Sequence, residues 1–299
     1  MKHIAFAASV TAALLLCAAP ALAQDCMIQP QGTLALTTTP DGTLAVPARL
    51  GGKEYAMAVE LGTPDSAVGE TVVRELGLPL ESMHIGLTYR GTMVSRQVTV
   101  PSVRLGAQVG TALPFLAVTD GSLPPGTAGV LGSRLLANAD VELDFRAGKL
   151  NLFSPIHCPG AVVYWADSAA SVPFTLDELG HIAFHMTLDG QDVSVSFGRG
   201  AATTIRMQTA YRLLGSDAYR RLAKPHPFRT LDVGGLAIGN PAIHVVDDGN
   251  DPACSGSFQE IGCFSRTDIE LGLSTLKALH LYIAFAEKTI FVTAADAHK

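Results

Sequence analysis

The chain repeats itself, and this internal repeat constrains the fold more than any other feature of the sequence. Residues 50–62 align without a gap with residues 188–200, and each stretch predicts a strand, a glycine turn, a second strand and a glycine-containing loop. Roughly 70 residues downstream, residues 129–153 match residues 269–292 as a Leu-Gly turn, a short helix and two strands. A unit of roughly 130 residues therefore occurs twice, which predicts two lobes related by a pseudo-twofold axis.

Helical patterns are few and short, and most of the chain has the pattern of short strands between turns. The sequence therefore predicts a mainly β protein with two tandem lobes and a few short helices, with any site between the lobes. We assign residues 24–154 to the first lobe, residues 155–173 to a proline-containing linker and residues 174–299 to the second lobe. The predicted helices span residues 70–76, 133–137, 207–214 and 274–279.

Residues 1–23 have the pattern of a cleavable signal peptide. Lys2 and His3 precede an apolar stretch over residues 4–16, and Ala21-Leu22-Ala23 provides small residues at the cleavage site. A membrane anchor is the weaker interpretation, because the apolar stretch ends before Pro20 and falls short of the roughly 20 residues that a spanning helix needs. We therefore expect a periplasmic or secreted protein with no membrane span after cleavage.

Cleavage after residue 23 would leave four cysteines, an even number that favours disulfides in an exported protein. Cys254 and Cys263 flank a loop rich in Gly, Ser and Asp, so we predict that they pair with each other, which leaves Cys26 to pair with Cys158. Zinc binding is the competing interpretation, but the chain contains no C-x-x-C spacing. The predicted role of these cysteines is structural.

Composition and short motifs argue against several classes of function. The 21 basic and 27 acidic residues give a net charge of −6, which argues against a nucleic-acid partner. Glycine-rich runs lack the Lys-Ser/Thr of a phosphate-binding loop, and no serine lies in a Gly-x-Ser-x-Gly elbow. His181 and His185 would share one face of a predicted strand, but no further ligands follow at a recognisable metal-binding spacing. We expect no metal and no cofactor.

Four elements of the repeat resemble the retropepsin-like aspartic peptidases in a fused, pepsin-like arrangement of two lobes. In the first copy, Val59-Glu60-Leu61-Gly62-Thr63 is similar to the family's apolar-Asp-Thr-Gly-Ala segment, and residues 129–132 are similar to the glycine element that supports it. In the second copy, Phe197-Gly198-Arg199-Gly200-Ala201 and Leu271-Gly272 occupy the same places. The resemblance spans almost all of residues 43–293 and implies two acid-protease barrels.

The resemblance also implies a site for extended peptide between the lobes. Two motif loops would line this site, and residues 85–93 fall where the family places its flap, a hairpin that closes over bound peptide. The implied partner is therefore a peptide or protein segment in the interlobe cleft, and the oligomeric state stays open. The residues implied in binding are Gly62, Thr63, Gly200 and Ala201 in the loops, and Tyr89, Arg90 and Gly91 at or near the flap tip.

The catalytic positions of that family are altered in this chain. In the family each lobe contributes one Asp, and the pair shares a proton because two carboxylates about 3 Å apart cannot both ionise. Here the first position holds Glu60 and the second holds Gly198, while the neighbouring Thr positions hold Leu61 and Arg199. Because Gly198 has no carboxylate to share a proton, the resemblance points to impaired catalysis.

Two hypotheses describe Glu60. In the first, Arg199 pairs with Glu60 and replaces the catalytic pair, because a nearby cation favours an ionised carboxylate. In the second, Glu60 is a solvated residue of the cleft. Asp65 follows five residues later, and we predict that it caps the helix at residues 70–76 and does not serve as a second acid.

Three functions follow from these residues and from the resemblance. The favoured one is an exported aspartic-peptidase-like protein, catalytically impaired or non-catalytic, that binds extended peptide between its lobes by strand addition. The first alternative is an active aspartic endopeptidase that hydrolyses peptide bonds with Glu60. The second alternative is a structural or scaffold protein whose cleft is filled by its own side chains.

Overall fold

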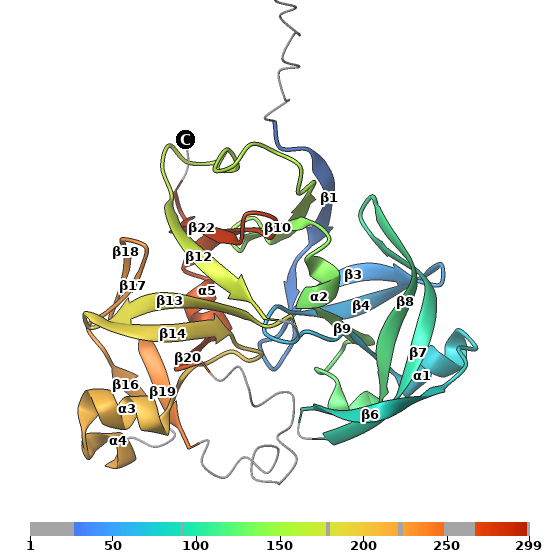
Figure 1. Cartoon of the computed structure of the whole chain (residues 1–299), viewed down its shortest axis with the longest axis horizontal. Helices are drawn as coiled ribbons and strands as arrows, with labels where there is room; N and C mark the ends of the chain where they lie inside the picture. The colour runs from blue at the N-terminus through green and yellow to red at the C-terminus, as the bar shows by residue number, and fades with distance from the viewer. Residues whose placement is uncertain (1–26, 91, 178–179, 221–223, 248–266, 298–299) are drawn as a thin grey trace, which may run out of the picture.

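The structure is a computed structural model that describes residues 27–90, 92–177, 180–220, 224–247 and 267–297. The protein is mainly β, as predicted, and its strands form two lobes (Figure 1). An eight-stranded sheet builds the first lobe, and a 14-stranded sheet contains the second lobe together with the strands that join the lobes. The helical segments are short: α1 (Glu70–Glu75), η1 (Asp120–Ser122), α2 (Ser133–Leu136), α3 (Met207–Leu214), α4 (Asp217–Arg220) and α5 (Leu273–Leu276).

The strands follow the chain in two similar series. The first series is β1 (Pro30–Ala35), β2 (Thr37–Thr38), β3 (Leu44–Leu50), β4 (Lys53–Glu60), β5 (Ala67–Gly69), β6 (Glu81–Tyr89), β7 (Thr92–Leu105), β8 (Gln108–Val118), β9 (Gly129–Gly132), β10 (Asp140–Asp144) and β11 (Lys149–Phe153). The second series is β12 (Ala170–Leu176), β13 (Ile182–Leu188), β14 (Gln191–Phe197), β15 (Thr203–Arg206), β16 (Pro225–Pro227), β17 (Thr230–Val233), β18 (Leu236–Gly239), β19 (Ala242–Val246), β20 (Ile269–Leu271), β21 (Leu279–Ala284) and β22 (Thr289–Ala294). Glycines with positive φ make the tight turns, such as Gly51 and Gly52 between β3 and β4.

Both lobes have the same sheet topology, which confirms the predicted repeat. In the first lobe β3 and β4 form a hairpin, β4 runs parallel to β9, β9 runs antiparallel to β5, and β5 runs parallel to β8. In the second lobe β13, β14, β20, β15 and β19 make the same connections in the same directions. Each motif loop therefore follows a strand, β4 or β14, that ends beside the Leu-Gly element of its own lobe.

Burial along the strands explains how the sequence specifies them. In β13 and β14 the buried residues alternate with more exposed ones, as expected for strands with one face in the core. The last four residues of β4, 57–60, are all buried, because Met57 and Val59 pack in one apolar cluster and Ala58 packs in another, so both faces of the strand are covered. The motif position at Glu60 is therefore carried into the interior of the lobe.

A six-stranded sheet joins the lobes in the order β1-β11-β10-β21-β22-β12. At its centre β10 pairs antiparallel with β21, with Leu143 opposite Leu281, so the pseudo-twofold axis passes between these two strands. The predicted helix at residues 274–279 is wrong at both ends. Helix α5 begins one residue earlier, at Leu273, and stops at Leu276, since β21 begins at Leu279 and draws the chain into the joining sheet.

Asp140 is the centre of a buried polar network at this joining sheet. His157, from the segment after β11, contacts the Asp140 carboxylate at 2.5 Å. Two groups of the second lobe donate to the same carboxylate, the Phe285 N–H at 2.9 Å and the Tyr282 hydroxyl at 3.2 Å. The network therefore connects the first lobe, the linker and the second lobe through one buried carboxylate.

Glu142, two residues along β10, repeats this arrangement. The Tyr164 hydroxyl of the linker donates to Glu142 at 2.8 Å, and the His280 ring of the second lobe contacts it at 2.7 Å. The ring of Trp165 stacks on His280 with 4.2 Å between ring centroids. Each of the two buried carboxylates of β10 therefore contacts a histidine.

We expect the stability of the protein to fall as the pH rises above about 6.5, the ordinary pKa of histidine. Burial disfavours the charged His157 ring, but the Cys158 carbonyl and the carboxylates of Asp140 and Glu287 outweigh it and raise its pKa. A raised folded-state pKa stabilises the fold fully below the unfolded-state pKa, and the stabilisation is lost as the pH rises through the folded-state pKa. Melting temperatures measured across this range should decrease, and His157→Gln should flatten the profile; an unchanged slope in that variant would contradict the assignment.

Some predicted features lie outside the described residues. Cys158 is disulfide-bonded, but Cys26, Cys254 and Cys263 are not described, so the pairing stays a prediction. The predicted signal peptide, residues 1–23, is not described either. Within the described ranges, no helix is both long enough and apolar enough to cross a membrane.

Candidate functional site

The two motif loops meet between the lobes. The first follows β4 and contains Gly62, and the second follows β14, which ends at Phe197. A Cβ placed on Gly62 would lie 1.8 Å from the carbonyl oxygen of Phe197, so the two backbones are in direct contact at this point. The residue at position 62 must therefore be glycine for the loops to approach this closely.

Each loop is held by the Leu-Gly element of its own lobe through equivalent hydrogen bonds. The Ser133 N–H donates to the Thr63 carbonyl at 2.8 Å, and in the second lobe the Ser274 N–H donates to the Ala201 carbonyl at 2.8 Å. The supporting glycines pack tightly, since a Cβ on Gly132 would lie 2.4 Å from the Pro64 oxygen. The pseudo-twofold symmetry therefore extends to the backbone of the loops.

Each lobe also contacts the loop of the other lobe. Thr43, in the turn before β3, donates its hydroxyl to the Arg199 carbonyl at 3.4 Å, and a Cβ on Gly42 would lie 2.6 Å from the Ala201 Cβ. In the reverse direction, Gly180 of the second lobe lies beside the first loop, since a Cβ on Gly180 would lie 3.5 Å from the Pro64 Cβ, and the Ser133 hydroxyl donates to the Gly180 carbonyl at 2.5 Å. These crossed contacts fix the position of one loop relative to the other.

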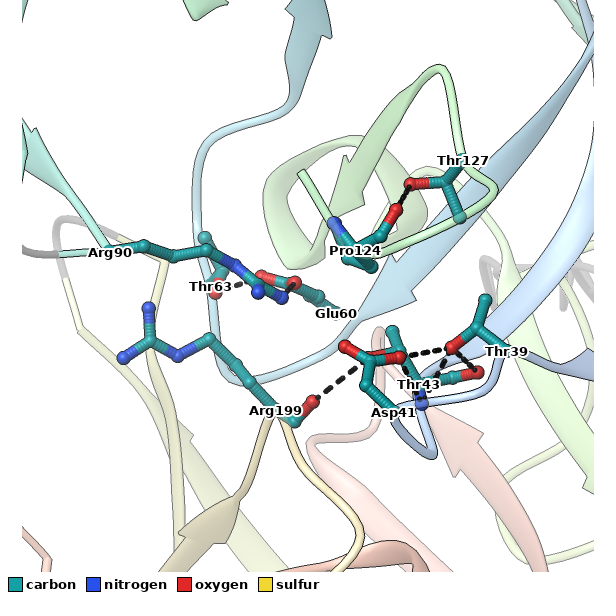
Figure 2. A network of polar contacts seen from close by, with 9 residues as sticks. All are labelled: Thr39, Asp41, Thr43, Glu60, Thr63, Arg90, Pro124, Thr127 and Arg199. Carbon is teal, nitrogen blue, oxygen red and sulfur yellow. Dashed lines mark hydrogen bonds and ion pairs between the residues drawn. The ribbon is translucent and has the colours of Figure 1, made fainter. Parts of the chain in front are cut away.

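Glu60 is almost completely buried, with 1% of its surface exposed. The Thr63 hydroxyl donates to Glu60 Oε2 at 2.8 Å, and Arg90 Nη2 donates to Glu60 Oε1 in an ion pair (Figure 2). The hypothesis of a solvated Glu60 is therefore wrong. The carboxylate is held on both oxygens by its own lobe.

Arg90 reaches Glu60 from the turn of the hairpin that β6 and β7 form. This residue has a positive φ of 49°, an uncommon backbone conformation for a residue other than glycine. Its side chain extends from the turn to the carboxylate, as Figure 2 shows. The Glu60 carboxylate raises the pKa of Arg90 against the opposing effect of burial. The segment that the resemblance assigned to a flap therefore closes on the motif position.

The expected pairing of Glu60 with Arg199 is not what the structure contains. Among the described residues Arg199 forms no ion pair within 4.0 Å, and its guanidinium lies to one side of the Glu60–Arg90 pair (Figure 2). The physical reason is that Arg199 extends from an exposed loop of the other lobe, while Arg90 approaches over the buried end of β4. The cation at Glu60 comes from the same lobe.

Tyr89 lies beside this ion pair and is 2% exposed. Its ring packs in a cluster with Ala58, Val94 and other apolar side chains, and the Arg90 Cζ lies 6.0 Å from the ring centroid. Burial and the negative charge of Glu60 raise the pKa of Tyr89, whereas Arg90 and Arg199 oppose the rise. Within the described structure, the Tyr89 hydroxyl and Arg90 Nε are buried without a hydrogen-bond partner.

The second motif position, Gly198, contributes only backbone atoms to the site, because glycine has no side chain. The Gly198 N–H donates to the Leu271 carbonyl at 2.8 Å. A Cβ at Gly198 would lie 3.0 Å from the same oxygen, a tight but not impossible contact. With a glycine at this position and an arginine bound to Glu60, the two motif positions cannot hold a pair of carboxylates that shares a proton.

The prediction that Asp65 caps α1 is wrong. Asp65 pairs with Arg134 at 2.6 Å, and α1 begins after Gly69 without a side-chain cap. Asp120, distant in sequence, binds the first turn of α1 from outside the helix. Its carboxylate accepts hydrogen bonds from the Thr71 N–H at 3.2 Å and from the Thr71 hydroxyl at 2.6 Å. No local pattern in the sequence predicts this contact, because Asp120 lies 49 residues from Thr71.

The remaining candidates lie apart from the motif loops. His181 contacts Asp177 at 2.8 Å and His185 contacts Asp192 at 3.0 Å, and the described residues contain no group of three or more potential metal-binding side chains. A surface pocket lies at the C-terminal end of β7, opposite to the end that follows Arg90. None of its lining side chains is titratable: Val103, Leu105, Gln108, Val109, Leu113, Leu135 and Asn138, with Gly110.

Sequence reasoning missed two features of this region. It named both Glu60 and Arg90 but did not pair them, although an arginine at the tip of a hairpin that faces a carboxylate was a usable signal. It did not identify Asp140 and Glu142 as buried partners of histidines. Three carboxylates at alternate positions of one short strand, Asp140, Glu142 and Asp144, with apolar residues between them, were the available signal for that network.

Comparison with known proteins agrees with the resemblance to aspartic peptidases. Residues 46–135, which contain Glu60 and Arg90, match a family model described as aspartyl protease. The structure is similar to the crystal structure of Basic 7S globulin from soybean, with a TM-score of 0.54 and 11% sequence identity over 91% of this chain and 96% of that chain. No curated protein matches the sequence. The resemblance and the two-lobed, acid-protease-like fold are therefore confirmed.

Proposed function

We propose that this chain is an exported aspartic-peptidase-like protein, non-catalytic or strongly impaired, that binds extended peptide between its lobes. One observation carries the proposal: Arg90 and Thr63 hold the Glu60 carboxylate, and the matching position of the other lobe is Gly198. The peptide would lie in an interlobe cleft bordered by the hairpin of β6 and β7. The protein would act in the periplasm or outside the cell.

Loss of catalysis follows from what the reaction requires. One carboxylate must accept a proton from the attacking water while a second, protonated one donates to the carbonyl oxygen of the scissile bond. Glu60 is buried in an ion pair, so it is neither free to bind water nor able to share a proton with Gly198. Neither motif position therefore offers the carboxylate base or the protonated acid that the reaction needs.

Peptide binding does not require those carboxylates. Strand β6 lies at one end of the strand order of the eight-stranded sheet, so an extended peptide can pair with its outer edge through backbone hydrogen bonds. Met93, which follows the hairpin turn, is 61% exposed and offers an apolar contact there. Strand addition would leave the Glu60–Arg90 pair in place.

We expect no specific cleavage of a denatured protein at about pH 4, where aspartic peptidases have the required protonation state. The same preparation should bind fluorescent extended peptides saturably. Cleavage that a transition-state-mimicking aspartic peptidase inhibitor blocks, and that Glu60→Ala abolishes, would establish an active endopeptidase in place of this proposal. Absence of both cleavage and peptide binding would favour the scaffold function.

A further inference from the structure

The tip of the β6–β7 hairpin, residues 87–90 and 92–94, lies beyond the regular part of its sheet. The register of the β6–β7 ladder shifts between Ser82 and Leu87, where the four residues of β6 between them lie opposite one residue of β7. On its other side, β7 pairs with β8 from Gln97 onward. Within the described ranges, the tip strands therefore pair with each other and not with the rest of the sheet.

Two neighbouring side chains of the tip connect it to the end of β4. The Tyr89 ring packs in the apolar cluster that contains Ala58, and Arg90 forms the ion pair with Glu60 (Figure 2). Ala58 and Glu60 are two residues apart on β4, so their side chains point to the same face of the strand. The tip therefore lies over one face of β4, directly before the first motif loop.

The ion pair is the contact that fixes the position of the tip. Apolar packing has no preferred direction, whereas a hydrogen bond from a guanidinium to a carboxylate does. Glu60 is itself immobile, because it is 1% exposed and the Thr63 hydroxyl donates to its other oxygen at 2.8 Å. Arg90 reaches it from a backbone conformation, φ 49°, that is unfavourable for a residue other than glycine. The ion pair offsets this backbone cost when the tip lies over β4.

We propose that the Glu60–Arg90 ion pair is the anchor that orders the hairpin tip for peptide binding, with Arg90 as a positioning residue. The inference rests on the proposed peptide-binding function and adds what controls the affinity. The last residues of β6 belong to the tip, so the anchor orders part of the edge to which an extended peptide would add. An edge that is ordered in the free protein binds more tightly, because less conformational entropy is lost on binding. Glu60 then has a positioning role in place of a catalytic one.

Amide hydrogen exchange of the full chain tests the anchor without any peptide. We expect the amides of the tip to be protected in the native chain and to lose most of this protection in Glu60→Gln and in Arg90→Gln. The amides of β21 should stay protected in both variants, which shows that the fold is intact. Arg96→Gln is the matched control, because Arg96 lies on the same hairpin and is exposed, without an ion pair in the described part of the chain. It should leave the tip protected.

Binding of fluorescein-labelled, randomised decapeptides tests the consequence of the anchor. Glu60→Gln and Arg90→Gln should each bind about tenfold more weakly than the native chain, since the apparent Kd rises as the fraction of molecules with an ordered tip falls. Arg90→Lys should retain part of the affinity. The double variant Glu60→Gln/Arg90→Gln should lose less binding free energy than the two single variants added together, because both break the same contact. Two independent structural defects would add.

The outcomes separate the anchor from the proposed peptide-binding function. Tip amides that are unprotected in the native chain, or that keep their protection in both single variants, would overturn the anchor whether or not peptide binds. Loss of protection with unchanged peptide affinity would overturn the role of the anchor in binding. If the folded native chain bound no peptide, the proposed function would fail, and the exchange measurements would still decide whether the ion pair orders the tip.

Discussion

Replacing Gly62 with alanine should destabilise the protein by about 3 kcal/mol, the upper range for inserting atoms into a packed interior. The added Cβ would lie 1.8 Å from the Phe197 carbonyl oxygen, and this neighbour is backbone of the other lobe that cannot rotate away. The two loops would have to separate, which strains the crossed contacts between the lobes. Urea unfolding can be followed by the fluorescence of Trp165, the only tryptophan in the chain.

Gly200 provides the matched control, because it is the equivalent glycine of the second motif loop. A Cβ on Gly200 meets nothing within 4 Å, so Gly200→Ala should change the free energy of unfolding by no more than about 0.5 kcal/mol. If both variants lost a similar free energy of unfolding, the contact between the loops would not be the reason that position 62 requires glycine. The comparison therefore tests a steric difference between the two loops, which are otherwise related by the pseudo-twofold axis.

Replacing Asp140 with alanine should cost about 3–5 kcal/mol, the range for breaking a buried charged pair by removing one partner. The Asp140 carboxylate is completely buried and serves His157, the Phe285 N–H and the Tyr282 hydroxyl at once. Its removal leaves these three groups buried without their partner, and two of them belong to the second lobe. The same urea titration measures the loss.

Two further variants separate this effect from a general sensitivity of β10. Asp144→Ala removes a carboxylate from the same strand that accepts one exposed hydrogen bond, from the Ala147 N–H, and should cost less than about 1 kcal/mol. Asp140→Asn keeps an acceptor for the Phe285 N–H and should fall between the two. If Asp140→Ala lost no more than Asp144→Ala, the buried network would not be what joins the lobes.

Much of the fold was predictable because its signals are local. Helix α3 begins and ends at the predicted residues, and α1 and α2 each end one residue early. The repeat predicted the shared topology of the lobes, because glycine turns and strand patterns at matching positions specify matching hairpins. The end of α5 was predicted wrongly, since the pairing of β21 with β10 of the other half of the chain decides it.

The candidate site was predictable only in part, for a related reason. The resemblance located both motif positions and the hairpin that contains Arg90. The partners of two side chains were predicted wrongly: Asp65 binds Arg134, and Glu60 binds Arg90. Each of these contacts joins elements that are separated in the sequence, so neither spacing nor periodicity reports the distance between them.

The sequence by itself determined that this protein has two similar lobes, that it is mainly β, and that its motif positions hold Glu60 and Gly198. These properties depend on residue identity and on patterns within a few neighbouring residues. The tertiary structure decided that Glu60 is buried and bound to Arg90, 30 residues away, and that Gly62 touches the opposite loop. Such contacts depend on how the sheets place distant segments in space, and this placement gives Glu60 a cation from the hairpin of its own lobe.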